Sequence, residues 1–228
     1  MSTAQALEQV RARIRAAAAA CGRQASDVKL VAVSKMHPVA KIREAYAAGQ
    51  RDFGENYVQE LLKKAEELRD LPELNWHLIG HLQRNKARHV AGLVAMLHTV
   101  DTPELASELA KRAAGAGERR LEVLVEVSIA GEEQKHGVEP IELGPLLDAI
   151  EALPALSLRG LMCVPPLNED ITITRPYFDA LRRLRDEHGG AARLPELSMG
   201  MTHDLEQAVA AGATLVRVGT AIFGARGP

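Results

Sequence analysis

Short apolar runs alternate with amphipathic stretches along the whole chain. Each run is rich in valine, isoleucine or leucine and is bounded by polar or small residues, which is typical of a buried strand. The first run, KLVAVSK, is largely apolar on both of its faces, as expected for a parallel strand that is covered on both sides. The strands expected from this pattern span residues 29–35, 52–56, 75–80, 96–101, 121–128, 156–164, 196–200 and 215–219.

The segments between these runs have the period of helices. In the opening segment Leu7, Val10 and Ile14 share one apolar face, and Gly22 ends the pattern. The expected helices span residues 3–21, 39–48, 58–68, 103–114, 141–152, 175–187 and 205–211.

Eight strands that alternate with helices predict a (β/α)8 barrel, also called a TIM-type barrel. We expect a single α/β domain of this kind over residues 1–228, with an extra N-terminal helix. A doubly wound open sheet is the alternative, but it usually has fewer strands. Since no room is left for a full helix after the last strand, the opening helix is expected to cover that strand.

Lys35 closes the first strand on the same face as Val31 and Val33. A lysine in such a place is costly unless it has a partner or a task. Either it leaves the strand and reaches water, or it serves a site at the C-terminal ends of the strands, where the chemistry of these barrels lies.

The last two expected strands end in segments rich in glycine, serine and threonine, LSMGMTHD and VRVGTAIFG. Phosphate sites in these barrels often use the loops after strands seven and eight, where backbone N–H groups can donate. The alternative is that the glycines serve tight turns and that a threonine caps the helix that begins near His203. The candidate phosphate-binding residues are Ser198, Gly200, Thr202, Gly219 and Thr220.

A phosphate site beside a buried lysine indicates a phosphorylated carbonyl compound that is held as a Schiff base. A lysine amine in an apolar site is more readily deprotonated, and it can then attack an aldehyde. Two classes of protein fit this chemistry, a sugar-phosphate aldolase and a pyridoxal phosphate protein.

Composition excludes some classes of partner and indicates the cellular compartment. The formal net charge is −2 and aromatic residues make up only 3%, so the chain has neither the basic excess nor the stacking surface that nucleic acid needs. No apolar run is long enough to span a bilayer, and the N-terminus lacks a secretory signal. The cysteines, Cys21 and Cys163, fit neither a disulfide framework nor a zinc spacing. We therefore expect a cytoplasmic protein without a metal site.

The blocks VAVSK, FGENYVQE, WHLIGHLQRNK, LMCVPP, LSMGMTHDLEQA and VRVGTAIFGAR occur in this order, from about Lys29 to Arg226. Together they resemble the pyridoxal phosphate homeostasis protein family, which is similar to the barrel domain of alanine racemase. The resemblance implies a barrel that binds pyridoxal 5′-phosphate and contributes to vitamin B6 homeostasis in the cell, without established turnover.

The resemblance also implies roles for single residues. Lys35 in VAVSK corresponds to the lysine that forms the aldimine with the cofactor, and Asn56 in GEN lies beside the cofactor ring. Arg217 in VRVG corresponds to the arginine that faces the pyridine nitrogen. The phosphate loops correspond to Ser198, Gly200, Thr202, Gly219 and Thr220; the family often has serine in place of Thr202, which keeps the hydroxyl.

Arg217 favours a cofactor binder over an enzyme, so no catalytic residue is assigned. A guanidinium can only donate, so a pyridine nitrogen beside it stays unprotonated and the ring is a weak electron sink. The alternative is a pyridoxal phosphate-dependent amino-acid racemase. That reaction needs a second base, which alanine racemase takes from an additional β-domain that this chain is expected to lack. A sugar-phosphate aldolase is the third and least favoured interpretation.

The expected partners are pyridoxal phosphate and related B6 vitamers, with cofactor-accepting apo-enzymes as candidates. Neither nucleic acid nor a membrane is expected to bind, and the chain is expected to be a monomer. No site role is assigned to His77 and His81, whose placement at a strand end favours packing or a loop. Lys135 and His136 are expected to belong to a solvated loop, and Cys163 to be an inert buried thiol.

Overall fold

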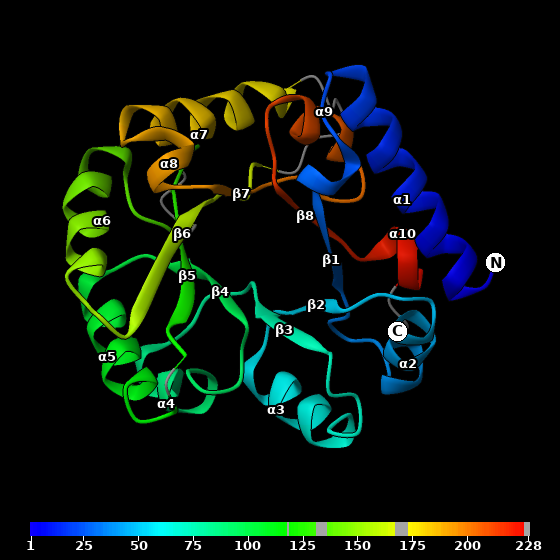
Figure 1. Cartoon of the computed structure of the whole chain (residues 1–228), viewed down its shortest axis with the longest axis horizontal. Helices are drawn as coiled ribbons and strands as arrows, with labels where there is room; N and C mark the ends of the chain where they lie inside the picture. Colours follow the sequence, from blue (N-terminus) through cyan, green and yellow to red (C-terminus); the bar gives the residue numbers. More distant parts are fainter. Residues whose placement is uncertain (118, 131–135, 167–172, 226–228) are drawn as a thin grey trace.

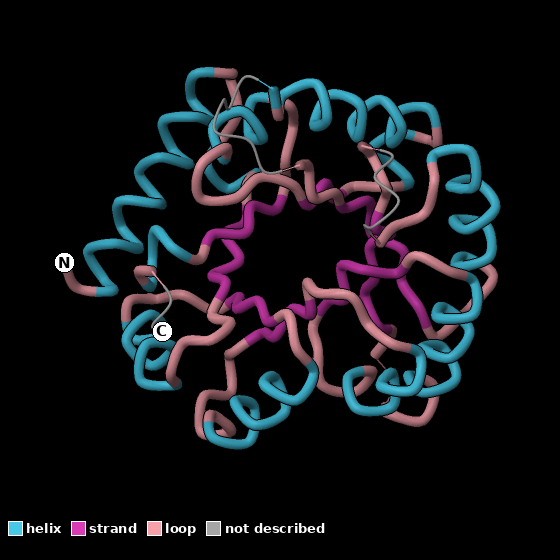
Figure 2. The backbone as a smooth tube through the Cα atoms, turned by 180° about the vertical axis from the view of Figure 1, so that it is seen from behind, coloured by secondary structure: helices cyan, strands magenta, loops and turns pink. Residues whose placement is uncertain are grey.

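Eight parallel strands form a closed barrel, in which each strand pairs with its neighbours in the sequence and β8 pairs with β1 (Figure 2). The computed structural model describes residues 1–117, 119–130, 136–166 and 173–225. The predicted (β/α)8 architecture is confirmed. The strands are β1 (Lys29–Val33), β2 (Asp52–Glu55), β3 (Asn75–Leu78), β4 (Met96–Val100), β5 (Leu121–Glu126), β6 (Leu156–Met162), β7 (Glu196–Ser198) and β8 (Leu215–Val218).

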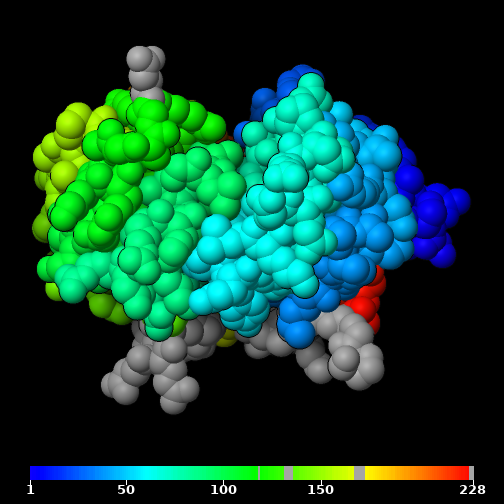
Figure 3. Space-filling view, turned by 90° about the horizontal axis from the view of Figure 1, so that it is seen from below, coloured from blue at the N-terminus to red at the C-terminus, as the bar shows by residue number. Residues whose placement is uncertain are grey.

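Helices surround the barrel as an outer ring (Figure 1), and Figure 3 shows the side of that ring over α3 and α5. None of the helices in the described ranges is long and apolar enough to cross a membrane. The α-helices are α1 (Thr3–Ala20), α2 (Val39–Ala47), α3 (Val58–Glu67), α4 (Ala87–Val90), α5 (Pro103–Ala113), α6 (Leu143–Glu151), α7 (Arg175–Glu187), α8 (Gly190–Arg193), α9 (Leu205–Ala210) and α10 (Thr220–Phe223). Short 3₁₀ turns are η1 (Ala25–Asp27), η2 (Arg84–Lys86) and η3 (Pro140–Glu142).

The opening helix α1 takes the place in the ring beside β8, because α10 after that strand is only one turn long (Figure 1). A capping box between Ser2 and Gln5 starts α1, whose apolar face packs against α9, α10 and α2. Arg13 on α1 bonds the Glu206 carboxylate and donates to the Thr202 carbonyl at 2.9 Å. The helix therefore also fixes the loop after β7.

The apolar core has two layers. A small cluster fills the barrel interior with side chains from alternate strand positions, namely Val31, Met96, Leu124, Met162 and Leu215. A larger cluster lies between the strands and the helices and takes the opposite strand faces, such as Val216 and Val218 on β8. Since Arg217 stands between these two valines, its side chain is directed to the interior.

The first strand ends two residues earlier than the sequence pattern predicted, at Val33 instead of Lys35. Lys35 and Met36 form a turn, and Met36 has a left-handed backbone with φ of 61°. The predicted helix over residues 141–152 begins as η3, so that α6 starts at Leu143. The short helices α4, α8 and α10 were not predicted.

Candidate functional site

A cavity of about 420 Å³ opens at the C-terminal ends of β1, β2, β7 and β8, the face where the sequence placed the chemistry. Residues far apart in the chain meet there. The predicted site residues among its lining are Lys35, Asn56, Thr202, Arg217, Gly219 and Thr220. The other lining residues are Val33, His37, Ile79, Val164, Met201 and His203.

The two remaining predicted residues, Ser198 and Gly200, are buried and are not part of the cavity lining. Gly200 has φ of 92°, and a Cβ there would come within 2.4 Å of the Ala208 Cβ. Only glycine fits this turn without strain. The structure thus agrees with the turn role that the sequence left open for Gly200.

The Thr202 loop differs from one alternative considered from sequence, in which Thr202 caps the next helix. Helix α9 begins at Leu205 with Asp204 as its N-cap, so the capping interpretation of Thr202 is wrong. Asp204 Oδ1 instead accepts from the Met201 backbone N–H at 2.6 Å. This bond tightens the loop and leaves the Thr202 side chain on the cavity.

The turn that carries Lys35 rests on a buried ionic group. Lys64 on α3 donates to the Ser34 carbonyl at 2.7 Å, to Glu55 Oε1 at 2.8 Å and to Glu60 Oε1 at 2.7 Å. The side chain of Lys64 is 6% exposed and that of Glu55 is 0% exposed. A buried charge is tolerable only when it is paired and hydrogen-bonded, as these groups are.

The same two carboxylates hold the residues on either side of Lys35. The Ser34 hydroxyl donates to Glu55 Oε1 at 2.7 Å, and the Met36 N–H donates to Glu60 Oε1 at 2.6 Å. Burial raises the pKa of Glu55, while Lys64 and Ser34 oppose that shift. The network therefore fixes the backbone that aims Lys35 at the cavity.

Arg217 is a buried cation on the wall of this cavity, with 4% of its surface exposed. Its Nη1 donates to Ser198 Oγ at 2.6 Å and its Nη2 donates to the Cys163 carbonyl at 2.9 Å. Burial lowers the pKa of Arg217, but arginine stays protonated in proteins. Two neutral acceptors thus hold the guanidinium in one orientation.

Ser198 connects Arg217 to a chain of hydrogen bonds through the barrel interior. Ser198 Oγ lies 2.9 Å from His98 Nδ1, and His98 Nε2 lies 2.9 Å from His77 Nδ1. His77 Nε2 lies 3.0 Å from Asp52 Oδ1 at the start of β2. This is the packing role that the sequence favoured for His77, now with named polar partners.

The direction of each bond follows from the two ends of this chain. A carboxylate at Asp52 only accepts, so His77 Nε2 donates to it and a neutral His77 accepts at Nδ1. His98 then donates from Nε2 and accepts from the Ser198 hydroxyl at Nδ1. Burial lowers the pKa of His98 well below 6.5, which agrees with a neutral ring. The Ser198 oxygen is therefore left to accept from Arg217.

Asn56 lies where β2 and β3 approach each other closely. A Cβ on Gly80 would come within 2.4 Å of the Asn56 carbonyl oxygen, so glycine is required there. Asn56 Oδ1 is buried and finds no hydrogen-bond partner among the described residues. An acceptor in that state on a cavity wall suits a ligand that donates a hydrogen bond.

A second cavity, of about 260 Å³, adjoins the first and shares Asn56, Ile79 and Val164 with it. Glu126, the last residue of β5, lines this second cavity. Burial is the main cause that raises the pKa of Glu126 to about 7, and the charge of Asp101 adds to it. Glu126 Oε2 also has no hydrogen-bond partner within the described chain.

The predictions for the remaining candidates have mixed outcomes. Cys163 is fully buried, as expected, and burial raises the pKa of its thiol to about 12, which supports the prediction that this thiol is inert. Cys21 is exposed. His136, which was expected only to belong to a solvated loop, also lines the second cavity. Lys135 lies outside the described residues.

Comparisons with known proteins agree on one family. The model for the N-terminal domain of alanine racemase matches residues 6–227. The pyridoxal phosphate homeostasis protein of Pseudomonas aeruginosa is 48% identical over 228 residues, which cover 99% of this chain and 97% of the relative. That of Aquifex aeolicus is 45% identical over 228 residues and 99% of both chains. PipY of Synechococcus elongatus, solved with PLP bound, is 41% identical with a TM-score of 0.85 and covers 98% of this chain and 100% of its own.

Proposed function

The chain belongs to the pyridoxal phosphate homeostasis protein family, and on that premise we propose that it holds pyridoxal 5′-phosphate on Lys35 and releases it to acceptor enzymes, without significant turnover. The observation that carries the proposal is the meeting of Lys35 and Arg217 in the lining of one cavity, where buried polar groups hold the turn that carries Lys35 and the guanidinium of Arg217. The PLP-bound relative supports the choice of ligand.

The residues present suit this cofactor. When bound, it supplies an aldehyde that a lysine amine can capture with loss of one water, and a ring that withdraws electrons. The cavity of about 420 Å³ is within the size range of small-molecule sites. The unpartnered Asn56 Oδ1 gives the ring edge a polar neighbour.

Gly219 and Thr220 would receive the phosphate together with Thr202. A Cβ on Gly219 would come within 3.0 Å of the Val33 carbonyl oxygen, so glycine keeps this wall close to β1. Thr220 is exposed to the cavity, and the first N–H groups of a helix have no partner within that helix. We assign Ser198 and Gly200 a supporting part, since one holds Arg217 and the other shapes the loop.

Arg217 is the reason for expecting little catalysis. Its guanidinium donates and cannot accept, so it keeps the ring nitrogen unprotonated and the ring a weak electron sink. Ser198 and the Cys163 carbonyl hold the guanidinium in place, so it does not swing away to allow protonation. A carrier benefits from this arrangement, because bound cofactor that does not react is available for transfer.

The competing function is an amino-acid racemase. Incubation of the cofactor-loaded protein with L- and D-alanine in deuterated water separates the two, with α-proton loss and chirality as readouts. Inversion at the common enzymatic rate of roughly 1–10³ s⁻¹ would establish the racemase. Slow or absent exchange, together with transfer of cofactor to an apo-enzyme, supports the carrier. The cytoplasmic location, the monomeric state and the acceptor enzymes stay predictions.

A further inference from the structure

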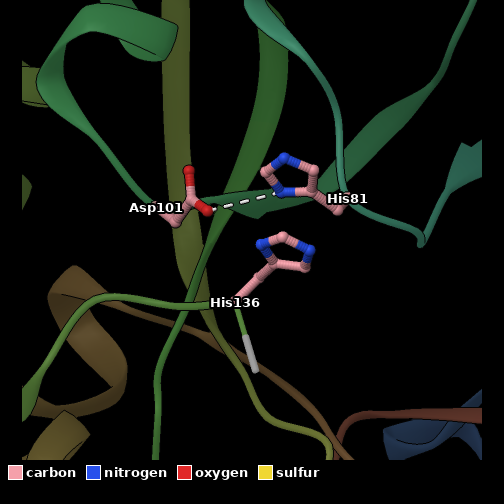
Figure 4. A group of neighbouring side chains, drawn as sticks. All are labelled: His81, Asp101 and His136. Atoms are coloured by element: carbon pink, nitrogen blue, oxygen red, sulfur yellow. Dashed lines mark ion pairs between the residues drawn. The ribbon is translucent and has the colours of Figure 1, made fainter. Parts of the chain in front are cut away.

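Three side chains that the proposed cofactor site does not use meet at the mouth of the barrel: His81, Asp101 and His136 (Figure 4). They follow β3, β4 and β5. One ligating atom of each lies within 4.8 Å of those of the other two, and His81 Nδ1 lies 3.5 Å from Asp101 Oδ2. Two imidazole nitrogens and one carboxylate oxygen are a donor set of open zinc and non-haem iron sites.

We propose that His81, Asp101 and His136 bind a divalent transition-metal ion, with zinc as the best-suited occupant. Imidazole nitrogen favours zinc and its neighbours in the transition series over magnesium and calcium, which prefer oxygen ligands throughout. Three protein ligands leave at least one coordination position open. This site was not expected from the sequence, where no zinc spacing is visible.

The second cavity gives an independent reason for a bound ion. His81 and His136 line it, and so does Glu126, whose buried Oε2 has no partner in the described parts of the chain and is not used by the proposed cofactor site. Water on an open position of the ion would donate to such an acceptor, which is how outer-shell groups commonly support a metal. The ion thus accounts for an acceptor that the protein itself leaves unsatisfied.

Metal binding requires the two rings to move. His81 and His136 are stacked with centroids 3.6 Å apart and an angle of 9° between the rings, so their nitrogen lone pairs lie in two nearly parallel planes and do not converge on one point. Zinc bonds of about 2.0–2.1 Å place tetrahedral ligands roughly 3.4 Å apart, so the cluster must turn and contract. Both histidines are exposed and can rotate, while Asp101 is half-buried at the end of β4 and serves as the fixed ligand.

The test is equilibrium dialysis of the full chain, freed of cofactor, against zinc, followed by elemental analysis. One zinc per chain is expected. The variants His81→Ala, His136→Ala and Asp101→Asn should each weaken binding by about 100-fold or more, because loss of an outer-shell group alone costs about 10–100-fold. His89→Ala and Cys21→Ser are the matched controls, since both residues are exposed and lie outside the cluster.

A second readout uses the unmodified chain, so it does not depend on how the variants fold. Zinc should protect His81 and His136 from diethyl pyrocarbonate, mapped by mass spectrometry, while His89 stays reactive. Absence of stoichiometric zinc, binding that all three cluster variants retain, or loss of binding in Cys21→Ser would each overturn the proposal. Since both readouts are made without cofactor, they are independent of the proposed carrier function.

Discussion

Replacing Glu126 by glutamine should stabilise the protein at neutral and alkaline pH. The pKa of Glu126 is raised from 4.5 to about 7, chiefly by burial, so ionisation of this carboxyl opposes folding. A shift of one unit corresponds to about 1.4 kcal/mol, which gives roughly 3 kcal/mol for the whole shift. A glutamine cannot ionise and therefore avoids that cost, while it keeps nearly the same shape.

The sign and the pH window follow from linkage. Because the folded pKa is raised, Glu126 costs nothing when it is protonated in both states, below about pH 4.5. The cost grows as pH rises toward 7 and is constant above that. The gain in the free energy of unfolding of Glu126→Gln over the parent chain should therefore be about 2–3 kcal/mol larger at pH 8 than at pH 5.

Urea unfolding at the two pH values, with a chelator present so that no metal interferes, measures this difference. Glu108→Gln is the matched control: the Arg112 guanidinium lowers the pKa of the Glu108 carboxyl, so its stabilising contribution is lost only as pH falls below about 4.5 and the effect of this substitution should be the same at pH 5 and pH 8. A stability difference for Glu126→Gln that does not change with pH, or that favours the parent chain at pH 8, would refute the reasoning.

Three further predictions concern the site and its support. Lys64→Met leaves Glu55 buried without its cation and should lower the free energy of unfolding, measured by chemical denaturation, by about 3–5 kcal/mol. Adding Glu55→Gln to the same chain removes the unpaired charge and should restore much of the lost stability. Thr220→Val should weaken binding of pyridoxal phosphate far more than binding of pyridoxal, and equal losses in titrations would exclude a phosphate contact. A thiol reagent should label Cys21 at once and Cys163 only after unfolding, as followed by mass spectrometry.

The fold could be predicted from the sequence because each strand is short and apolar and each helix has one apolar face, so local patterns specify the alternation. The placement of Lys35 and Arg217 followed from the same reasoning, since Lys35 follows the apolar run that ends at Val33 and Arg217 stands between Val216 and Val218 near the end of the last strand. The barrel then brings these ends together, as the closed strand order confirms.

The chain of hydrogen bonds behind Arg217 could not be predicted in the same way. The four residues of this chain lie on four different strands, namely Asp52, His77, His98 and Ser198. Their contact depends on the register of the strands, which decides which interior side chains lie at the same height along the barrel axis. Nothing local distinguishes His98 in MLHTV from a residue that simply packs in the core. For Ser198, nearness in sequence to the Thr202 loop suggested a phosphate contact, while its strand position directs it toward Arg217.

Lys64 is a case where a signal was present in the sequence. It follows Leu61 by three residues and so lies on the buried face of α3, whereas its neighbour Lys63 is 79% exposed. A lysine on an apolar helix face that packs against a strand ending in Glu55 indicates a buried ion pair. What the pattern does not reveal is that this pair supports the Lys35 turn, because that requires the packing of α3 against the segment after β1.

The most direct test of the central claim is to load the protein with pyridoxal phosphate, reduce it with borohydride and map the modified residue by peptide mass spectrometry. The account predicts that the cofactor is fixed on Lys35, and that Lys35→Ala removes both the visible absorption band and the modification while the chain stays folded. Lys64, which is engaged with Glu55 and Glu60, should stay unmodified. Attachment to another lysine alone, with Lys35 unmodified, would contradict the account.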